Sequence, residues 1–208
     1  MPDSEEWEAL RQELERAGVA GTQELGRFVS SVGFFGASQF DERAAMPVLL
    51  AALPRLTDAR LVSSVAGHLR RPWARPQAFD PLLSAFRKWA PSDTTTGWHL
   101  GDALGSASTI NRVADVVDVC RNEAFGIARQ MPVAALARFK KAPEVRPALL
   151  ALIHDADVGL HAMSALRRVL GAAEALPYIE DVERAHEGTQ LGAQATRELR
   201  KIRKSEKQ

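Results

Sequence analysis

The sequence APEVRPALLALIHDADVGLHAMSALRRVL, residues 142–170, contains two apolar stripes with the period of an α-helix. Val145, Leu149 and Ile153 lie at i, i+4 and i+8, which places them on one side of a helix. We predict two helices of about a dozen residues each, joined by an Asp-rich turn whose Asp157 caps the second helix. The apolar positions of that second helix are Val158, Ala162, Ala165, Leu166 and Val169.

The same helix pair recurs along the chain with a period of 30 to 35 residues. Two helices of this length cannot bury both apolar stripes between themselves, so each pair requires neighbours on both sides. We therefore predict five helix pairs over residues 41–204. The aligned leucines late in the second helices are Leu69, Leu104, Leu136, Leu166 and Leu199.

Residues 1–40 do not follow the repeat, and we predict that they form an N-terminal helical cap. A helix over residues 3–17 ends at Gly18, and a second helix over about residues 22–32 leads into a Phe-rich loop that ends near Phe40. A repeat array needs a terminal unit with a different outer face, because its end has no neighbour to cover it. We expect this segment to serve that purpose.

The composition predicts an all-α protein, with 46% apolar and 25% charged residues and no alternating runs of β-branched residues. No linker rich in Gly, Ser or Pro divides the chain, so we predict one domain over residues 1–208, with residues 205–208 as a tail. The sequence has neither a secretory signal nor about 20 consecutive apolar residues, so we expect a cytoplasmic protein without a membrane span. Cys120, the one cysteine, is expected to be buried.

The repeat units resemble HEAT repeats, in particular the short phycobilisome-lyase-like type, over residues 41–204. The residues that match the repeat pattern are Pro147, Leu149, Leu150, Asp155, Asp157, Val158, Ala162, Ala165 and Leu166. Two departures are Gly159, where the family usually has arginine, and an expected enlarged loop over residues 90–97. The resemblance implies a right-handed, armadillo-type α-solenoid whose second helices line a concave surface. The family contains scaffolds, lyase subunits, hydroxylases and nucleic-acid binders, so the resemblance alone implies no single function.

The predicted second helices carry an excess of positive charge. They contain 14 Lys and Arg residues against 5 Asp and Glu, whereas the net charge of the whole chain is +1. Such a surface would attract an acidic partner. The alternative is that basic residues gather at the ends of helices because they complement the helix dipole there. The candidate binding residues of this surface are Arg70, Arg71, Arg138, Arg167, Arg168 and Arg200.

The segment Arg70-Arg71-Pro72-Trp73-Ala74-Arg75-Pro76 is a second candidate binding site. Its three guanidinium groups and its indole, Trp73, have the chemistry to clamp a phosphate or stack on a base. A packing role is the alternative, because two prolines stiffen the connection between units while Trp73 covers the seam. We favour the packing role.

A third candidate constellation, Trp98, Asp102 and Arg129, is loosely similar to the cleft of HEAT-like alkylpurine DNA glycosylases. Trp98 and Asp102 lie at i and i+4 on one helix face, and Arg129 follows on the second helix of the next unit. The further aromatic residue of that family would fall near Leu166, which is not aromatic. Base excision is therefore only an alternative hypothesis.

Metal and covalent chemistry have weak signals in the sequence. His154, His161 and the intervening acids could form a ligand set, and His186-Glu187 is the one His-Glu pair, but histidines at helix ends more often cap or face solvent. We predict no metal ligand, no catalytic residue and no cofactor. Our leading hypothesis is a non-enzymatic scaffold or adaptor that binds an acidic protein partner on its concave surface. The alternative partner is nucleic acid.

Overall fold

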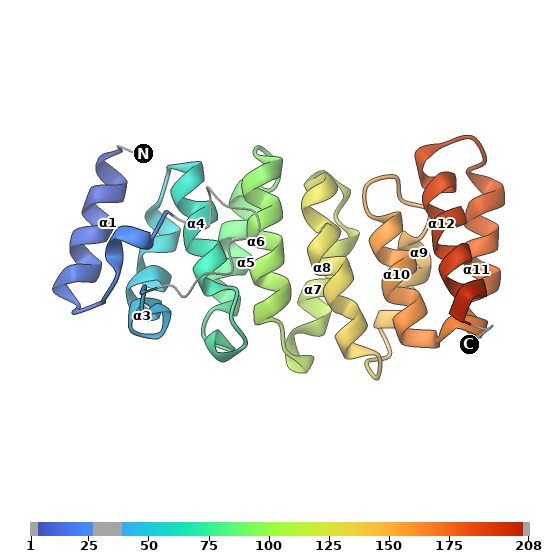
Figure 1. The fold of residues 1–208 in the computed structure, drawn as a ribbon, viewed down its shortest axis with the longest axis horizontal. Coiled ribbons are helices and arrows are strands. Elements are labelled where there is room, and N and C mark those ends of the chain that lie inside the picture. Colours follow the sequence, from blue (N-terminus) through green and yellow to red (C-terminus); the bar gives the residue numbers. More distant parts are fainter. Residues whose placement is uncertain (1–3, 27–38, 206–208) are drawn as a thin grey trace. The chain divides into compact units, whose positions relative to one another are not determined.

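The computed structural model describes residues 4–26 and 39–205, and these residues form helices and no strands (Figure 1). The all-α prediction is therefore confirmed. The chain divides into two compact units, an N-terminal unit Met1–Ala107 and a C-terminal unit Ser108–Gln208. Most of the predicted second helix of the cap and its Phe-rich loop lie outside the described residues. Within the described ranges, no helix combines the length and the apolar character needed to cross a membrane.

The N-terminal unit contains the predicted cap helix and two helix pairs. In the pairs, α3 packs on α4 and α5 packs on α6, and the second helices α4 and α6 also pack on each other. Gly18, with φ of 75°, follows the first helix as predicted. The elements are α1 Glu5–Arg16, the 3₁₀ helix Thr22–Glu24, α3 Glu42–Ala52, the 3₁₀ helix Leu53–Arg55, α4 Ala59–Leu69, the 3₁₀ helix Pro72–Ala74, α5 Phe79–Trp89 and α6 Thr94–Ala107.

The cap helix α1 is attached to the first helix pair through Asp58. One carboxylate oxygen of Asp58, Oδ2, accepts hydrogen bonds from Trp7 Nε1 at 3.2 Å and from Ser4 Oγ at 2.9 Å. The other oxygen accepts from the backbone N–H groups of Arg60 and Leu61, which caps α4. The Asp58 carboxylate therefore both caps α4 and contacts α1.

The expected enlarged loop over residues 90–97 is wrong, because α6 begins at Thr94. Asp93 Oδ1 accepts a hydrogen bond from the Thr96 backbone N–H at 2.9 Å, and Asp93 Oδ2 accepts from Thr96 Oγ1 at 3.0 Å. This cap allows the polar run of threonines to form the first turn of the helix. The connection between α5 and α6 is therefore only residues 90–93.

The C-terminal unit contains the other three predicted helix pairs. Figure 1 shows α8, α10 and α12 in front of α7, α9 and α11, and the second helices pack side by side as α8 on α10 and α10 on α12. The elements are the 3₁₀ helix Ile110–Arg112, α7 Val113–Arg121, the 3₁₀ helix Glu123–Arg129, α8 Gln130–Ala135, the 3₁₀ helix Leu136–Phe139, α9 Val145–Leu152, α10 Gly159–Leu170, α11 Ala172–Ala185 and α12 Gln190–Ser205.

The helix pair of residues 142–170 forms as predicted, but its turn is capped by a different residue. Asp155 Oδ1 accepts hydrogen bonds from the backbone N–H groups of Asp157 at 2.8 Å and Val158 at 3.1 Å. The prediction that Asp157 caps α10 is wrong, because the free N–H groups of this turn belong to residues 157 and 158. Asp155 precedes both residues and accepts from both, and no side chain caps α10 itself.

The second helix of the third predicted pair is broken into three short pieces. Gly126 has φ of 47° and ψ of −136°, a conformation that few residues other than glycine adopt, and it interrupts the 3₁₀ helix before α8. Pro132 then occupies the first turn of α8, where its missing N–H costs no helical hydrogen bond. The apolar side of the segment, which includes Val133 and Leu136, is still buried.

Candidate binding surface

In the C-terminal unit, the side formed by the second helices is strongly basic. The elements Gln130–Ala135, Leu136–Phe139, α10 and α12 contain a single acidic residue, Glu198. Lys140 and Lys141 directly follow the second of these elements. The basic residues within the four elements are Arg138, Arg167, Arg168, Arg197, Arg200, Lys201, Arg203 and Lys204.

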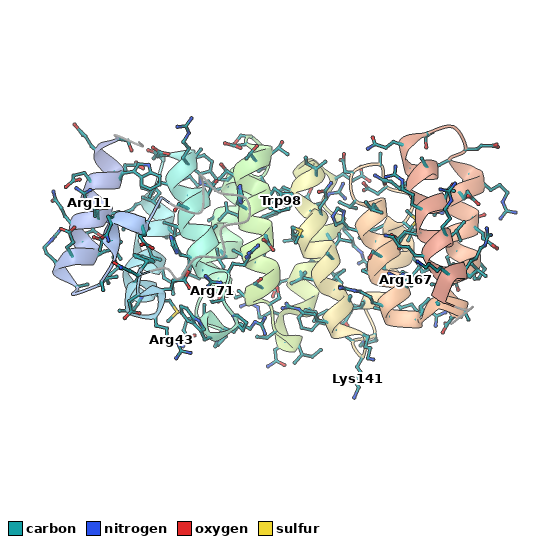
Figure 2. All side chains as sticks on the ribbon, viewed as in Figure 1. Arg11, Arg43, Arg71, Trp98, Lys141 and Arg167 are labelled. Carbon is teal, nitrogen blue, oxygen red and sulfur yellow. The ribbon has the colours of Figure 1, made fainter. Side chains whose placement is uncertain are left out.

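Glu198 is buried and is neutralised by two of these cations. Its exposed fraction is only 1%, and its Oε2 lies 3.5 Å from Nε of Arg167 on the neighbouring helix α10. Its Oε1 accepts from the ammonium group of Lys201. Figure 2 shows Arg167 on α10 extending toward α12. The one carboxylate of these four elements is therefore buried between two cations.

One side of α12 carries a row of exposed cations. Arg197, Arg200 and Lys204 lie at i, i+3 and i+7 and are all exposed, which places them on one stripe of the helix. Arg203 is directed elsewhere, because its Nη2 lies 3.2 Å from Oε1 of Glu180 on α11. We define the second-helix basic surface as the exposed residues Arg138, Lys140, Lys141, Arg168, Arg197, Arg200, Lys201 and Lys204.

Compensation of the helix dipole accounts for only part of this surface. The last turn of α12 contains Arg203 and Lys204, and that of α10 contains Arg167 and Arg168. The favourable effect of a cation on the dipole fades within one turn of the helix end. Arg197 and Arg200 lie earlier in α12, so their presence requires another reason.

The candidate arginines of the N-terminal unit contact partners within the chain. Arg71 donates two hydrogen bonds to Glu42, at 2.5 and 2.7 Å. Arg70 pairs with Asp102, and Arg75 donates to the backbone carbonyl of Ser106. These three guanidinium groups therefore contact three different partners. These contacts do not support the phosphate-clamp hypothesis for this segment, and they favour the packing role instead.

Trp73 is half-buried, and an arginine from outside its own segment lies over it. The guanidinium carbon of Arg43 is 5.3 Å from the centroid of the indole ring. A cation in this position interacts favourably with the ring face. The ring that was a candidate for base stacking thus contacts a side chain of α3.

The Glu42 carboxylate joins Arg71 to a buried histidine. Its Oε1 lies 3.3 Å from Nδ1 of His68, and His68 Nε2 lies 3.0 Å from the carbonyl oxygen of Leu25. Burial opposes ionisation of this carboxyl, but the hydrogen bonds from His68 and Arg71 outweigh it and hold the pKa of Glu42 below its ordinary value of 4.5. The ionised form of Glu42 is therefore stabilised by folding.

We expect Glu42→Gln to lower the free energy of unfolding by about 2 kcal/mol at neutral pH. The folded pKa lies below the unfolded one, so the contribution is complete above about pH 4.5 and is lost as the pH falls through the folded pKa. The difference between the two proteins should therefore shrink in acid. Urea unfolding of both proteins at several pH values measures it, and a difference that stays constant with pH would contradict this account.

Arg129 is buried and has a structural position. Its exposed fraction is 1%, and it donates to the carbonyls of Cys120 at 3.1 Å and Gly126 at 3.0 Å and to Asp155 Oδ2 at 2.9 Å. The prediction of Arg129 as a binding residue is therefore wrong, because no partner can reach a buried guanidinium group. The carboxylate that pairs with Arg129 lies 26 residues away in the sequence, so no local pattern indicates that this side chain is buried.

Trp98 and Asp102, the other members of the glycosylase-like constellation, lie on α6. Trp98 is half-exposed and contacts His99 edge-to-face, with ring centroids 5.5 Å apart. Asp102 pairs with Arg70. Without Arg129, these two residues do not form the predicted set.

Cys120 is not placed to act as a nucleophile. Cys120 is fully buried, and this burial raises the pKa of its thiol far above the ordinary value, so the thiolate is not accessible. Among the described side chains, no group of three or more His, Cys, Asp or Glu residues is arranged to surround a metal ion. His154 and His186, which the sequence-based reasoning treated separately, lie side by side with ring centroids 5.3 Å apart. The sequence signal for this contact is the separation of 32 residues between the two histidines, which is one repeat.

Comparisons of the chain with family models, with curated proteins and with solved structures found no match. The resemblance to HEAT repeats therefore stays a prediction from the repeat residues.

Proposed function

We propose that this chain is a non-enzymatic, HEAT-like scaffold or adaptor that binds an acidic protein partner through the second-helix basic surface. The observation that carries the proposal is the charge segregation in the C-terminal unit. Three adjacent second-helix segments present exposed Arg and Lys side chains, and their single acid is buried under Arg167 and Lys201. A surface of one sign attracts a partner of the opposite sign and accelerates its association.

An acidic protein suits this surface better than a single-stranded nucleic acid. Proteins that hold single strands combine a basic groove with aromatic rings on which the bases stack. In the described part of the chain, the large apolar residues with high exposure are Ile110 and Ile127, and neither is aromatic. The one aromatic residue in the four elements that carry the second-helix basic surface, Phe139, is buried.

The proposal includes the finer architecture implied by the sequence. We place the five helix pairs in one right-handed α-solenoid, with residues 1–40 as its cap and its second helices on the concave side. Packing of α4 on α6, of α8 on α10 and of α10 on α12 supports this arrangement within each unit. A cytoplasmic location belongs to the same proposal.

Reversal of three charges tests the binding surface. The variant Arg168→Glu/Arg197→Glu/Arg200→Glu is expected to lose the partner that the wild-type chain captures from its native cells, because like charges then face each other. A matched control is Arg60→Glu/Arg87→Glu/Arg121→Glu, which changes the net charge equally at exposed arginines on α4, α5 and α7. The control is expected to retain the partner. Mass spectrometry quantifies the captured partner for the wild-type chain and for both variants.

The same experiment separates the two partner classes. Partners that remain bound after nuclease treatment support a protein partner. Capture that disappears with nuclease, together with binding of a labelled duplex that weakens steeply as salt rises, would instead favour nucleic acid. Equal capture by the charge-reversal variant and the wild-type chain would contradict the proposed surface.

A further inference from the structure

His154 and His186 bring two imidazole nitrogens together at the junction of two helix pairs. His154 follows α9, and His186 caps the C-terminus of α11. Nδ1 of His154 lies 3.1 Å from Nε2 of His186, and the rings are inclined at 36°. The two ring nitrogens therefore face each other at the junction.

The distance between these nitrogens matches that of two ligands on one metal ion. Two imidazole nitrogens at about 2.0–2.1 Å from a tetrahedral metal are roughly 3.3 Å apart. The observed separation of 3.1 Å is close to this value. A metal ion in this position would take the place of the proton that one ring now shares with the other.

A carboxylate lies next to the outer nitrogen of one ring, as it does in many histidine metal sites. Oδ2 of Asp181 lies 3.6 Å from Nε2 of His154, the nitrogen that points away from His186. The other oxygen of Asp181 accepts a hydrogen bond from Nη2 of Arg184 at 3.1 Å. The negative charge of Asp181 beside the outer nitrogen favours a proton there, which is the tautomer that leaves Nδ1 free to bind a metal.

We propose that His154 and His186 form a two-histidine site for a divalent transition-metal ion of the class that prefers imidazole, such as Cu²⁺, Zn²⁺ or Ni²⁺. The protein supplies two ligands, and water completes the coordination shell because the His154 side chain is 40% exposed. A bound ion ties the turn after α9 to the end of α11. It therefore stabilises the junction between two helix pairs, independently of the basic surface.

Titration of the untagged full-length chain with CuCl₂ tests the site. We expect one tight equivalent by calorimetry, and an electron paramagnetic resonance spectrum with hyperfine structure from two nitrogens. His154→Ala and His186→Ala should each weaken binding at least about tenfold, and Asp181→Asn should weaken it by about tenfold. His161→Gln is the matched control, since His161 lies in the same unit, and it should bind as the wild type does. Unchanged binding in the double variant His154→Ala/His186→Ala would overturn the proposal.

A measurement on the wild-type chain does not depend on whether the variants fold. Addition of ZnCl₂ should shift the ¹⁵N resonances of His154 Nδ1 and His186 Nε2, and should leave those of His99 and His161 in place. Zn²⁺ should also raise the midpoint of thermal unfolding, because it binds the folded chain. If neither histidine resonance moves, the two rings share only a hydrogen bond and the site does not exist.

Discussion

Replacement of Arg129 by methionine is expected to lower the free energy of unfolding by about 4 kcal/mol. The guanidinium group satisfies the carbonyls of Cys120 and Gly126 and pairs with Asp155. Methionine fills much of the same volume but donates no hydrogen bond, so the variant leaves a carboxylate and two carbonyls without this partner. The effect should be among the largest in the chain, because removal of one partner from a buried pair strands the other charge.

The measurement is chemical unfolding followed by circular dichroism, with Arg121→Met as the control. Arg121 is an exposed arginine at the end of α7, and its replacement should change the free energy by no more than about 0.5 kcal/mol. If Arg129→Met unfolds at the same denaturant concentration as the control, the structural role assigned to Arg129 is wrong.

The second large effect is expected at Gly192, where alanine should destabilise the chain by about 3 kcal/mol. In a helix, glycine is usually less favourable than alanine by about 1 kcal/mol, so replacement of a helical glycine by alanine ordinarily stabilises a protein. Here a Cβ atom would overlap the carbonyl oxygen of His186 and lie 2.8 Å from its carbonyl carbon. That carbonyl is held in place because it accepts hydrogen bonds from the N–H and the hydroxyl of Thr189.

Ala193→Gly is the matched control for Gly192→Ala. Residue 193 is exposed in the same turn of α12, so glycine there should cost only about 1 kcal/mol through its helix propensity. The two variants are compared by thermal and urea unfolding. A Gly192→Ala protein as stable as the wild type would show that the turn between α11 and α12 can move away from α12.

The local periodicity of the sequence predicted the helix pairs, because apolar spacing is a property of each segment by itself. The spacing of Val145, Leu149 and Ile153 gave α9, and all three side chains are buried. Caps were harder to predict. Asp155 and Asp157 are both suitable acceptors. Which of them precedes the free N–H groups depends on the residue at which the helix begins.

The candidate site was predicted only in part, because the environment of a charged side chain depends on residues about one repeat away. Arg71 meets Glu42 across 29 residues, and Arg70 meets Asp102 across 32. These pairs remove the N-terminal unit from the predicted basic surface. The same spacing joins His154 to His186. The signal that the sequence holds for these contacts is a separation of about one repeat, 29 to 32 residues.

Zero-length crosslinking of the captured partner tests the central claim most directly. A carbodiimide joins a lysine amine to a carboxylate that is in contact with it, so it reports where an acidic partner lies. Four of the five lysines in the described residues, Lys140, Lys141, Lys201 and Lys204, belong to the second-helix basic surface, and the fifth, Lys88 on α5, is an internal control. We predict crosslinks from the four surface lysines to partner carboxylates and none from Lys88. Crosslinks confined to Lys88, or formed only between carboxylates of this chain and lysines of the partner, would contradict the account.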